Sequence, residues 1–326
     1  MKDIGLAGFP YAGKSTLFTA LTRVGAAGGR SNQAVVPVPD PRLAVLAELE
    51  RSRKVVPAQV RFVDVPGGLS AQGVATLREA DALALVLRGF GPDASPAGEL
   101  DRLRTELLLA DMAVVESALE NARRRSKGGR SPVPEVPVLE RAATALAGEQ
   151  PLSEAQWTDD ERQHLRALAP LTLKPWIPVV NLEEGMEVPG GLPEGAVGVW
   201  ASIEAETAGM PEDEARTLLA EFGVAEPGLD RVIAAGYGAL DLITFLTTGE
   251  DETRAWEVRR GATAQEAAGV IHTDLSRGFI RAEVVGYGDL VASGGWSEAR
   301  ARGLLRVEGK DYVIREGDVL HVRFNV

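Results

Sequence analysis

The stretch GFPYAGKS at residues 8–15 follows the pattern G-x-x-x-x-G-K-[ST], which is typical of a phosphate-binding loop. An apolar run at residues 1–7 comes before it, and residues 16–21 carry apolar side chains at helical spacing after it. The sequence therefore predicts a buried strand, a glycine-containing loop and a helix in succession, which is the context that this motif requires. In such a loop, successive backbone N–H groups surround a phosphate at the positive end of the helix dipole.

The polar residues of this loop have expected roles in binding a nucleotide. We expect Lys14 to reach the β- and γ-phosphates and the Ser15 hydroxyl to bind Mg²⁺. An ordinary glycine turn between a strand and a helix is the alternative, and the lysine, the serine and the flanking pattern together argue against it. The loop residues that we expect to contact a nucleotide are Gly8, Pro10, Tyr11, Ala12, Gly13, Lys14, Ser15 and Thr16.

The composition is that of an ordinary globular protein, with 326 residues, 45% of them hydrophobic and 25% charged. The absence of cysteine excludes disulfides and thiolate metal sites and fits a reducing cytoplasm, where we expect this protein to be located. The first predicted strand begins at once, so we expect no signal peptide, and no apolar run approaches the roughly 20 residues of a membrane span. A net charge of −12 argues against a broad nucleic-acid-binding surface, and we expect no DNA partner.

The order of patterns along the chain predicts three parts. Strands and helices alternate over residues 1–98 and again over residues 171–241, so we expect these two segments to form one P-loop G domain. Residues 99–170 are mainly helical and predict an inserted helical hairpin. Residues 242–326 predict a small α+β domain of the β-grasp type, with short mixed strands around a helix at residues 263–276. The expected fold class is therefore α/β, with an α-helical insertion and a C-terminal β-grasp domain.

A second candidate segment ends the β-rich run at residues 60–65. P-loop proteins hold Mg²⁺ through a carboxylate at such a strand end, so Ser15 and Asp64 are the expected metal ligands. Gly67 is expected to donate its N–H to a γ-phosphate, which makes Lys14 and Gly67 the candidate catalytic groups. An aspartate at a strand end can alternatively be a turn residue or a helix cap.

A third candidate segment, N-L-E-E at residues 181–184, ends a later strand where such folds read the base. The guanine signature N-K-x-D uses its aspartate to accept hydrogen bonds from the N1–H and the 2-amine of guanine. Here Glu184 stands at the fourth position and Leu182 replaces the lysine, and adenine has neither of the groups that such a carboxylate accepts. A polar surface turn is the alternative. The residues expected to contact the base, including two after the next strand, are Asn181, Leu182, Glu184, Ala201 and Ser202.

With these motifs in place, the chain resembles the Obg-like ATPase family of the YchF type, a branch of the translation-factor-related P-loop NTPases. The matching segments are residues 8–21, 36–43, 62–67, 107–111, 181–184, 203–206 and nearly all of 229–326. The resemblance covers most of the chain and is most specific at its C-terminal end. It implies a G domain, an inserted helical hairpin and a C-terminal TGS domain. It also implies Mg²⁺-dependent binding of ATP in preference to GTP through the N-x-x-E motif, and association with the ribosome.

The chain departs from the family pattern around the phosphates. Tyr11 stands where family members carry an asparagine, which in related NTPases helps to hold an activating potassium ion. The segment between Arg23 and Val36 is short and lacks the usual switch I threonine, for which Ser31 is a weak substitute. We therefore doubt potassium activation and expect an incomplete switch I.

Switch II is also shortened after Gly67, and Gly68 stands where a water-orienting glutamine is found in relatives. Residues 88–100 contain no counterpart of the family's histidine linked to hydrolysis. Phosphoryl transfer needs an oriented water and switches that close over the γ-phosphate, so binding is expected to survive better than turnover. We expect a weak ATPase. The alternatives are a hydrolysis-deficient nucleotide-binding adaptor and a GTPase of the Obg-related group.

The basic cluster Arg123–Arg130 is the best candidate for contacts with rRNA phosphates, because it places five Lys or Arg residues within eight positions of an acidic chain. Positive charge at a helix C-terminus is favoured by the helix dipole alone, by about 0.3–1 kcal/mol per group, so a solvated hairpin tip is the alternative. The TGS-like region at residues 242–326 holds 11 basic and 13 acidic residues. We expect it to dock on the ribosome or another protein by shape.

Overall fold

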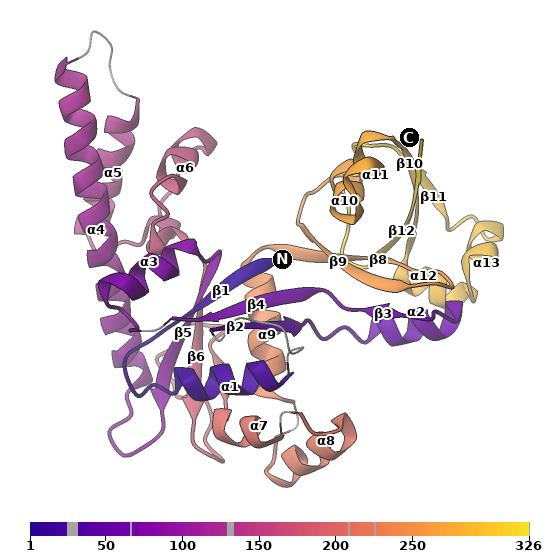
Figure 1. Cartoon of the computed structure of the whole chain (residues 1–326), viewed down its shortest axis with the longest axis horizontal. Coiled ribbons are helices and arrows are strands. Elements are labelled where there is room, and N and C mark those ends of the chain that lie inside the picture. The colour runs from indigo at the N-terminus through magenta and orange to yellow at the C-terminus, as the bar shows by residue number, and fades with distance from the viewer. Residues whose placement is uncertain (25–31, 66, 129–133, 208, 225, 326) are drawn as a thin grey trace. The chain divides into compact units, whose positions relative to one another are not determined.

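The computed structural model describes residues 1–24, 32–65, 67–128, 134–207, 209–224 and 226–325 (Figure 1). Its residues form two compact units. The larger comprises Lys2–Val36 and Arg61–Gly236, and the smaller comprises Met1, Pro37–Val60 and Tyr237–Val326. None of the described helices combines the length and the apolar composition that crossing a bilayer requires.

The larger unit is built on a six-stranded sheet with the order β2-β4-β1-β5-β6-β7. Its strands are β1 (Lys2–Ala7), β2 (Gln33–Pro37), β4 (Gln59–Asp64), β5 (Ala82–Gly89), β6 (Trp176–Leu182) and β7 (Val197–Val199). β5 is parallel to both β1 and β6, and β6 is parallel to β7. The central strand β5 is apolar and buried over its first six residues, as parallel sheets with both faces covered require. The predicted strands at residues 1–7 and 60–65 correspond to β1 and β4.

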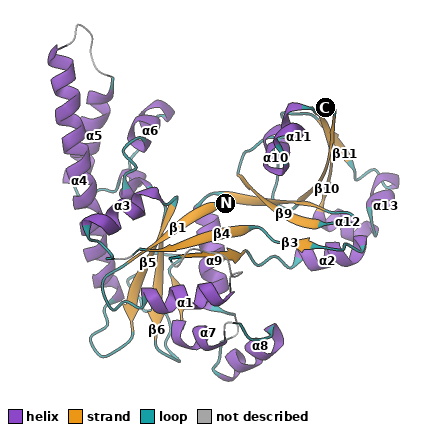
Figure 2. Cartoon of the chain, viewed as in Figure 1, coloured by secondary structure: helices purple, strands orange, loops and turns teal. Residues whose placement is uncertain are grey.

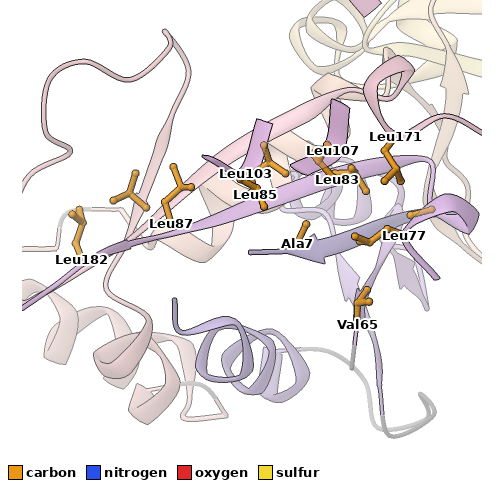
Figure 3. Packing of buried hydrophobic residues seen from close by; sticks show 12 residues of the cluster. Ala7, Val65, Leu77, Leu83, Leu85, Leu87, Leu103, Leu107, Leu171 and Leu182 are labelled. Atoms are coloured by element: carbon orange, nitrogen blue, oxygen red, sulfur yellow. The ribbon is translucent and has the colours of Figure 1, made fainter. Parts of the chain in front are cut away.

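Helices surround this sheet (Figure 2). They are α1 (Lys14–Val24), α3 (Ala71–Glu79), α4 (Pro96–Gly128), α5 (Glu135–Ala147), α6 (Asp159–Arg166), α7 (Ala201–Thr207), α8 (Glu212–Glu221) and α9 (Gly228–Ala239), with short 3₁₀ turns η1 (Leu152–Glu154) and η2 (Leu171–Leu173). Leucines of β5 and α4 interlock in one core, with Leu83 and Leu85 facing Leu103 and Leu107 (Figure 3). Burial of each such side chain stabilises the fold by about 1.5–3 kcal/mol.

The predicted helical hairpin is formed by α4 and α5, which pack side by side (Figure 1). The 33-residue helix α4 belongs to two cores: Leu103 and Leu107 pack on the sheet, whereas Val115 and Leu119 pack against α5. Because one continuous helix enters both cores, the hairpin is anchored in the larger unit by its own first turns. The predicted insertion at residues 99–170 is therefore attached to the sheet by the packing of α4 on β5.

The smaller unit contains a second sheet with the order β11-β10-β12-β8-β9-β3. Its elements are β3 (Val55–Val56), β8 (Leu242–Thr247), β9 (Thr253–Arg259), β10 (Phe279–Gly286), β11 (Arg306–Glu308) and β12 (Asp318–Phe324), with α2 (Arg42–Glu50), α10 (Ala264–Ile271), α11 (Thr273–Arg277), α12 (Tyr287–Ser293) and α13 (Trp296–Ala301). β8 and β9 are antiparallel, and β12 is parallel to β8 and antiparallel to β10. This arrangement around α10 confirms the expected β-grasp fold.

Two details differ from the sequence-based expectations. The helix predicted at residues 263–276 is two helices, because His272 has an extended backbone and its ring Nδ1 accepts the N–H of Asp274, which starts a new helix. The segment Pro37–Val60 also belongs to the same compact unit as the residues from Tyr237 onwards, whereas the predicted boundaries place it in the P-loop domain. The physical reason is the parallel pairing of β3 with β9.

Candidate functional site

The loop between β1 and α1 has the conformation that a phosphate cradle needs. Gly13 has φ +88°, and Tyr11 has φ +67°, which is costly for a residue with a side chain, about 1–3 kcal/mol. At Gly8 a Cβ atom would lie 2.5 Å from the carbonyl oxygen of Val86. Gly8 is therefore required because a side chain would not fit there, and Gly13 is required because its φ angle is positive.

Lys14 folds back over the loop. Its Nζ donates to the carbonyl oxygens of Gly8 at 2.9 Å and Phe9 at 2.8 Å. Burial lowers the pKa of Lys14, while the negative charges of Asp64 and Glu99 act in the opposite direction and raise it. The lysine thus brings a half-buried positive charge to the loop, with two carboxylates close enough to act on it.

The two predicted metal ligands have the right chemistry for Mg²⁺. Ser15 is exposed in the first turn of α1, and its hydroxyl makes no hydrogen bond to any residue that the structure describes. Asp64 ends β4, and its backbone N–H donates to Asn32 at 3.0 Å. One hydroxyl and one carboxylate are what P-loop proteins contribute, because phosphate oxygens and waters complete the octahedral shell. The described residues hold no group of three or more His, Cys, Asp or Glu that could bind a metal by themselves.

The turn after β4 lies against the phosphate loop. Gly67 and Gly68 have φ +80° and +56°, and the N–H of Gly68 donates to Val65 at 3.1 Å. A Cβ atom on Gly68 would lie 3.5 Å from the carbonyl oxygen of Gly8. The N–H of Gly73 donates to the Ser70 side chain, which caps the start of α3. Gly67, predicted at the γ-phosphate, is therefore near the loop, whereas Ser31 lies outside the described residues.

Asn181 connects the base-side strand to the phosphate loop. It is 6% exposed, and its Nδ2 donates to the carbonyl oxygen of Ala12 at 3.3 Å. A Cβ atom on Gly13 would lie 1.9 Å from the same nitrogen. The side chain was predicted to contact the base, and the structure brings it to the loop backbone. Its direct partner among the described residues is therefore the loop between β1 and α1.

The remaining predicted base contacts lie on two neighbouring turns. Leu182 is buried at the end of β6, and Glu184 follows it, exposed, in a turn closed by the N–H of Met186 donating to Glu183 at 3.1 Å. A cavity of about 390 Å³ borders these turns and includes Leu182, Met186, Trp200 and Glu204 in its lining. The first-turn N–H groups of α7, at residues 201–202, have no partner within their own helix. Ala201 is buried and Ser202 is exposed.

Sequence reasoning missed two buried carboxylates near these turns. Glu99, in the first turn of α4, accepts the N–H of Arg88 at 2.8 Å and acts electrostatically on Lys14. Glu204, in α7, accepts the N–H groups of Trp200 at 3.3 Å and Leu229 at 2.7 Å. The sequence signal for Glu99 is an acidic residue in the first turn of a long helix. Glu204 also lies in the first turn of its helix and accepts the N–H of the nearby Trp200, but its second partner, Leu229, is far along the chain.

The arginines of the hairpin tip pair with glutamates. Ion pairs join Arg123 to Glu140 at 2.7 Å, Arg124 to Glu120 at 2.5 Å and Arg125 to Glu135 at 3.0 Å. All six side chains are substantially exposed, so each pair is worth little, about 0–1 kcal/mol. Arg130, at the end of the predicted cluster, lies outside the described residues. The solvated-tip alternative accounts for these contacts without a partner.

Comparison with known proteins decides the family. The chain is 40% identical over 358 aligned positions to the "Ribosome-binding ATPase YchF" of Pasteurella multocida (strain Pm70), covering 99% of each chain. The chain belongs to the YchF family. The protein of the same name from Bacillus subtilis (strain 168) is 37% identical over 361 positions, again with 99% coverage of each chain.

Structure and family models agree with this assignment. The solved structure described as "Structure of the Schizosaccharomyces pombe YchF GTPase" matches with a TM-score of 0.90 and 29% identity, and covers 99% of this chain and 97% of that one. A family model named YchF-GTPase_C, described as "Protein of unknown function (DUF933)", matches residues 242–325. The expected fold class, a P-loop G domain with a C-terminal TGS-like domain, is therefore confirmed. The alignment to the Pasteurella multocida protein is longer than this YchF-family chain, so that relative carries residues that this chain lacks.

Proposed function

We propose that this chain is a Mg²⁺-dependent, purine-nucleotide-binding P-loop protein that prefers ATP to GTP, turns it over slowly and associates with the ribosome. The observation that carries the proposal is the loop at residues 8–15. Lys14 is folded over its carbonyls, and Asn181 holds its backbone from the base side. A loop held in this way fits the anion cradle that P-loop proteins use.

In this proposal different residues bind the phosphates, the Mg²⁺ ion and the base. The loop N–H groups and Lys14 hold the phosphates, and Ser15 with Asp64 would hold Mg²⁺, which supplies charge neutralisation at the β- and γ-oxygens. The exposed Glu184 and the N–H groups of residues 201–202 read the base edge. Glu184 stands where the guanine signature has an aspartate, and the printed names of the Pasteurella multocida and Bacillus subtilis relatives are those of ATPases, whereas the Schizosaccharomyces pombe structure is titled a GTPase.

Slow turnover follows from the same residues. Gly68 provides no side chain to orient a water, and the described part of residues 88–100 provides no histidine. Tyr11 is 91% exposed and provides no amide oxygen for a potassium ion. The adaptor alternative shares this site but assigns the nucleotide a purely structural role.

Ribosome association rests on the relatives' printed names and on two surfaces of this chain. At the hairpin tip, phosphate can replace the glutamates that pair with Arg123, Arg124 and Arg125, because these pairs are exposed and weak. In the TGS-like domain, Arg281 stands directly opposite Arg323 across β10 and β12. Arg323 pairs with Glu283 at 3.3 Å, and the domain has slightly more acidic than basic residues, so docking by shape fits this surface. A ribosomal partner and the absence of described membrane-spanning helices fit a cytoplasmic location.

Calorimetric titration with ATP, GTP and ADP, each with and without Mg²⁺, tests the nucleotide proposal. We expect ATP to bind at least about tenfold more tightly than GTP, a difference of about 1.4 kcal/mol. Lys14→Ala should weaken both by about ten- to a hundredfold, because it removes hydrogen bonds from a charged donor. The matched control is Lys54→Ala, whose side chain is 65% exposed and pairs with Glu252. A tenfold preference for GTP would overturn the base assignment.

Co-sedimentation with ribosomes in ATP, in ADP and without nucleotide separates the switch from the adaptor. The switch predicts binding that depends on the nucleotide and is lost in Lys14→Ala. The adaptor predicts equal binding in all three conditions and in the variant.

A further inference from the structure

Glu204 is a buried carboxylate that the roles assigned above do not use. It is 3% exposed and lies in α7, just after the turn that leaves β7. One oxygen accepts the N–H of Trp200 and the other accepts the N–H of Leu229, at the start of α9. The N–H of Gly228 also bonds to this carboxylate. All of these donors are backbone groups, so the carboxylate fixes the course of two chain segments.

On the side that faces Gly228, Glu204 is closely packed. A Cβ atom on Gly228 would lie 2.7 Å from Oε1 of Glu204, 2.8 Å from the carbonyl oxygen of Gly198 and 2.9 Å from Cα of Val199. The start of α9 is therefore pressed against both β7 and Glu204. A shift of the β7–α7 turn towards α9 would therefore create a clash, and a shift away from it would stretch the hydrogen bonds of Glu204.

The turn between β7 and α7 also contacts the turn after β6, which carries Glu184. The indole Nε1 of Trp200 donates to the carbonyl oxygen of Met186 at 3.1 Å, which fastens the turn that carries Glu184. Glu204 fixes the backbone of Trp200, and Trp200 fixes the Glu184 turn. Two segments that both border the same cavity are thus held through one residue.

We propose that Glu204 is a positioning residue for nucleobase selectivity. By holding the Trp200–Ser202 backbone and, through Trp200, the Glu184 turn, it sets the direction of the groups that read the purine edge. It acts without touching the phosphates, which the loop at residues 8–15 holds independently. This inference rests on the proposed nucleotide binding, and it assigns selectivity to a residue outside the N-x-x-E motif. Positional errors of this kind are costly, because directional hydrogen bonds weaken steeply when misaligned.

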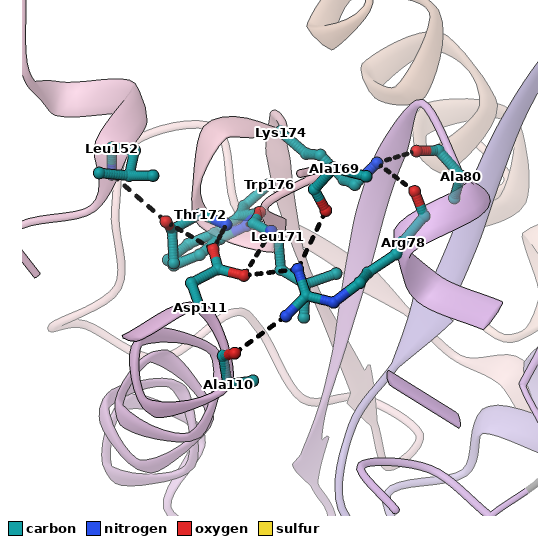
Figure 4. Close-up of polar contacts among 10 residues, drawn as sticks. All are labelled: Arg78, Ala80, Ala110, Asp111, Leu152, Ala169, Leu171, Thr172, Lys174 and Trp176. Atoms are coloured by element: carbon teal, nitrogen blue, oxygen red, sulfur yellow. Dashed lines mark hydrogen bonds and ion pairs between the residues drawn. The ribbon is translucent and has the colours of Figure 1, made fainter. Parts of the chain in front are cut away.

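The alternative is that Glu204 merely stabilises the fold, and Asp111 provides the matched control for it. Asp111 is also fully buried and also accepts backbone N–H groups, from Leu171 and Thr172 (Figure 4). Those donors lie before β6, at the amino end of the strands, whereas Glu204 lies after β7, at the carboxyl end where the phosphate loop is. A change at Asp111 therefore tests loss of buried hydrogen bonds without disturbing the base-side turns.

The experiment measures the affinity of Glu204→Gln, Glu204→Ala, Trp200→Phe and Asp111→Asn for ATP, GTP and inorganic tripolyphosphate, with Mg²⁺ and at a temperature where each variant is folded. For Glu204→Ala we expect ATP to bind at least about tenfold more weakly and the ATP-to-GTP affinity ratio to fall towards one. Tripolyphosphate, which has no base, should bind within about twofold of the wild type. Glu204→Gln, which keeps one acceptor oxygen, should lie between, and Asp111→Asn should keep the wild-type ratio.

Trp200→Phe keeps the inference testable if Glu204→Ala does not fold. It keeps an aromatic ring but removes the donor to Met186, so the ATP-to-GTP ratio should again fall. The inference is overturned if ATP and tripolyphosphate weaken equally, or if the ratio stays at the wild-type value in every Glu204 and Trp200 variant that folds. Failure of the wild type to bind ATP would instead overturn the proposed function.

Discussion

Glu204 and Asp111 show how one kind of buried group performs two tasks at opposite ends of the same sheet. Asp111 is paired with Arg78, whose guanidinium donates to Asp111 at 2.8 Å and to the carbonyl oxygens of Ala110 and Ala169 (Figure 4). Arg231 acts on Glu204 by charge, while its Nη2 donates to the Gly198 carbonyl at 3.0 Å. The well-paired carboxylate fastens the hairpin to the sheet, and the less compensated one lies beside the candidate ligand site.

The two carboxylates differ in how fully their burial is compensated by neighbouring groups. Burial raises the pKa of Glu204, as its hydrogen bonds from Leu229, Gly228 and Trp200 only partly oppose it. Ionisable groups with strongly shifted pKa values are concentrated at functional sites, although structural ion-pair networks also contain them.

The largest effect is expected at the Asp111 end. Arg78→Met leaves the Asp111 carboxylate buried without its cation, and breaking a buried pair in this way costs about 3–5 kcal/mol of unfolding free energy. Urea denaturation measures the loss, and ATP affinity of the folded protein should stay within about twofold. An unfolding free energy within about 1 kcal/mol of the wild type would mean that the pair does not anchor the hairpin.

Gly228→Ala should disturb the Glu204 end. The new methyl group meets Glu204, Gly198 and Val199 at less than 3 Å, and overpacking of this kind costs about 1–3 kcal/mol. Calorimetry should also show weaker ATP binding, unlike the case of Arg78→Met. Gly238→Ala, in the same helix with no atom within 4 Å of its Cβ, is the control and should be neutral or slightly stabilising. Equal effects of the two changes would contradict the close fit at Gly228.

Thr172→Val tests whether the Asp111 network depends on its side-chain donor. The hydroxyl of Thr172 donates to Asp111 at 2.8 Å and accepts the N–H of Leu152 at 3.4 Å, so its loss leaves that Asp111 oxygen with the backbone N–H alone and leaves the Leu152 N–H without this acceptor. Denaturation should show a loss of about 1.5–3 kcal/mol, the range for a hydrogen bond to a charged group. No measurable loss would mean that the Asp111 network does not depend on this hydroxyl.

The pH dependence of stability should separate Glu204 from its neutral isostere. Because the folded pKa of Glu204 lies above its ordinary value of 4.5, the protonated form is favoured in the folded protein. Its stabilising contribution is present below pH 4.5 and is lost as pH rises through the raised pKa. Glu204→Gln lacks this loss, so the unfolding free energy of the wild type should fall relative to the variant as pH rises above 4.5 and through the raised pKa of Glu204. Parallel curves would show that Glu204 does not titrate in this way.

The smallest effect is expected at the hairpin tip. Arg124→Gln breaks an exposed pair with Glu120 one helical turn away and should change the unfolding free energy by less than about 0.5 kcal/mol. Its effect on ribosome co-sedimentation should instead grow as salt is lowered, because phosphate contacts are salt-dependent. A salt-independent result would argue that the tip does not contact phosphate.

Local patterns predicted the parts of the site that are contiguous in sequence. The strand, loop and helix around Lys14 follow from glycine spacing and apolar periodicity, and Asp64 follows from the end of β4. What the sequence did not predict are pairings between distant residues. The bond from Asn181 to Ala12 and the bond from Leu229 to Glu204 exist because strands from distant parts of the chain lie side by side. Hydrophobic periodicity and residue propensities along the chain cannot predict either of these two contacts.

The short strand β3 has a practical consequence for dissecting this protein. Val55 and Val56 cover the edge of β9, and they reach the smaller unit from a segment almost two hundred residues earlier in the chain. A fragment starting at Leu242, where the family match begins, would leave that edge of β9 unpaired. An open strand edge is a template for intermolecular pairing, so such a fragment should self-associate unless Pro37–Val60 is supplied in trans.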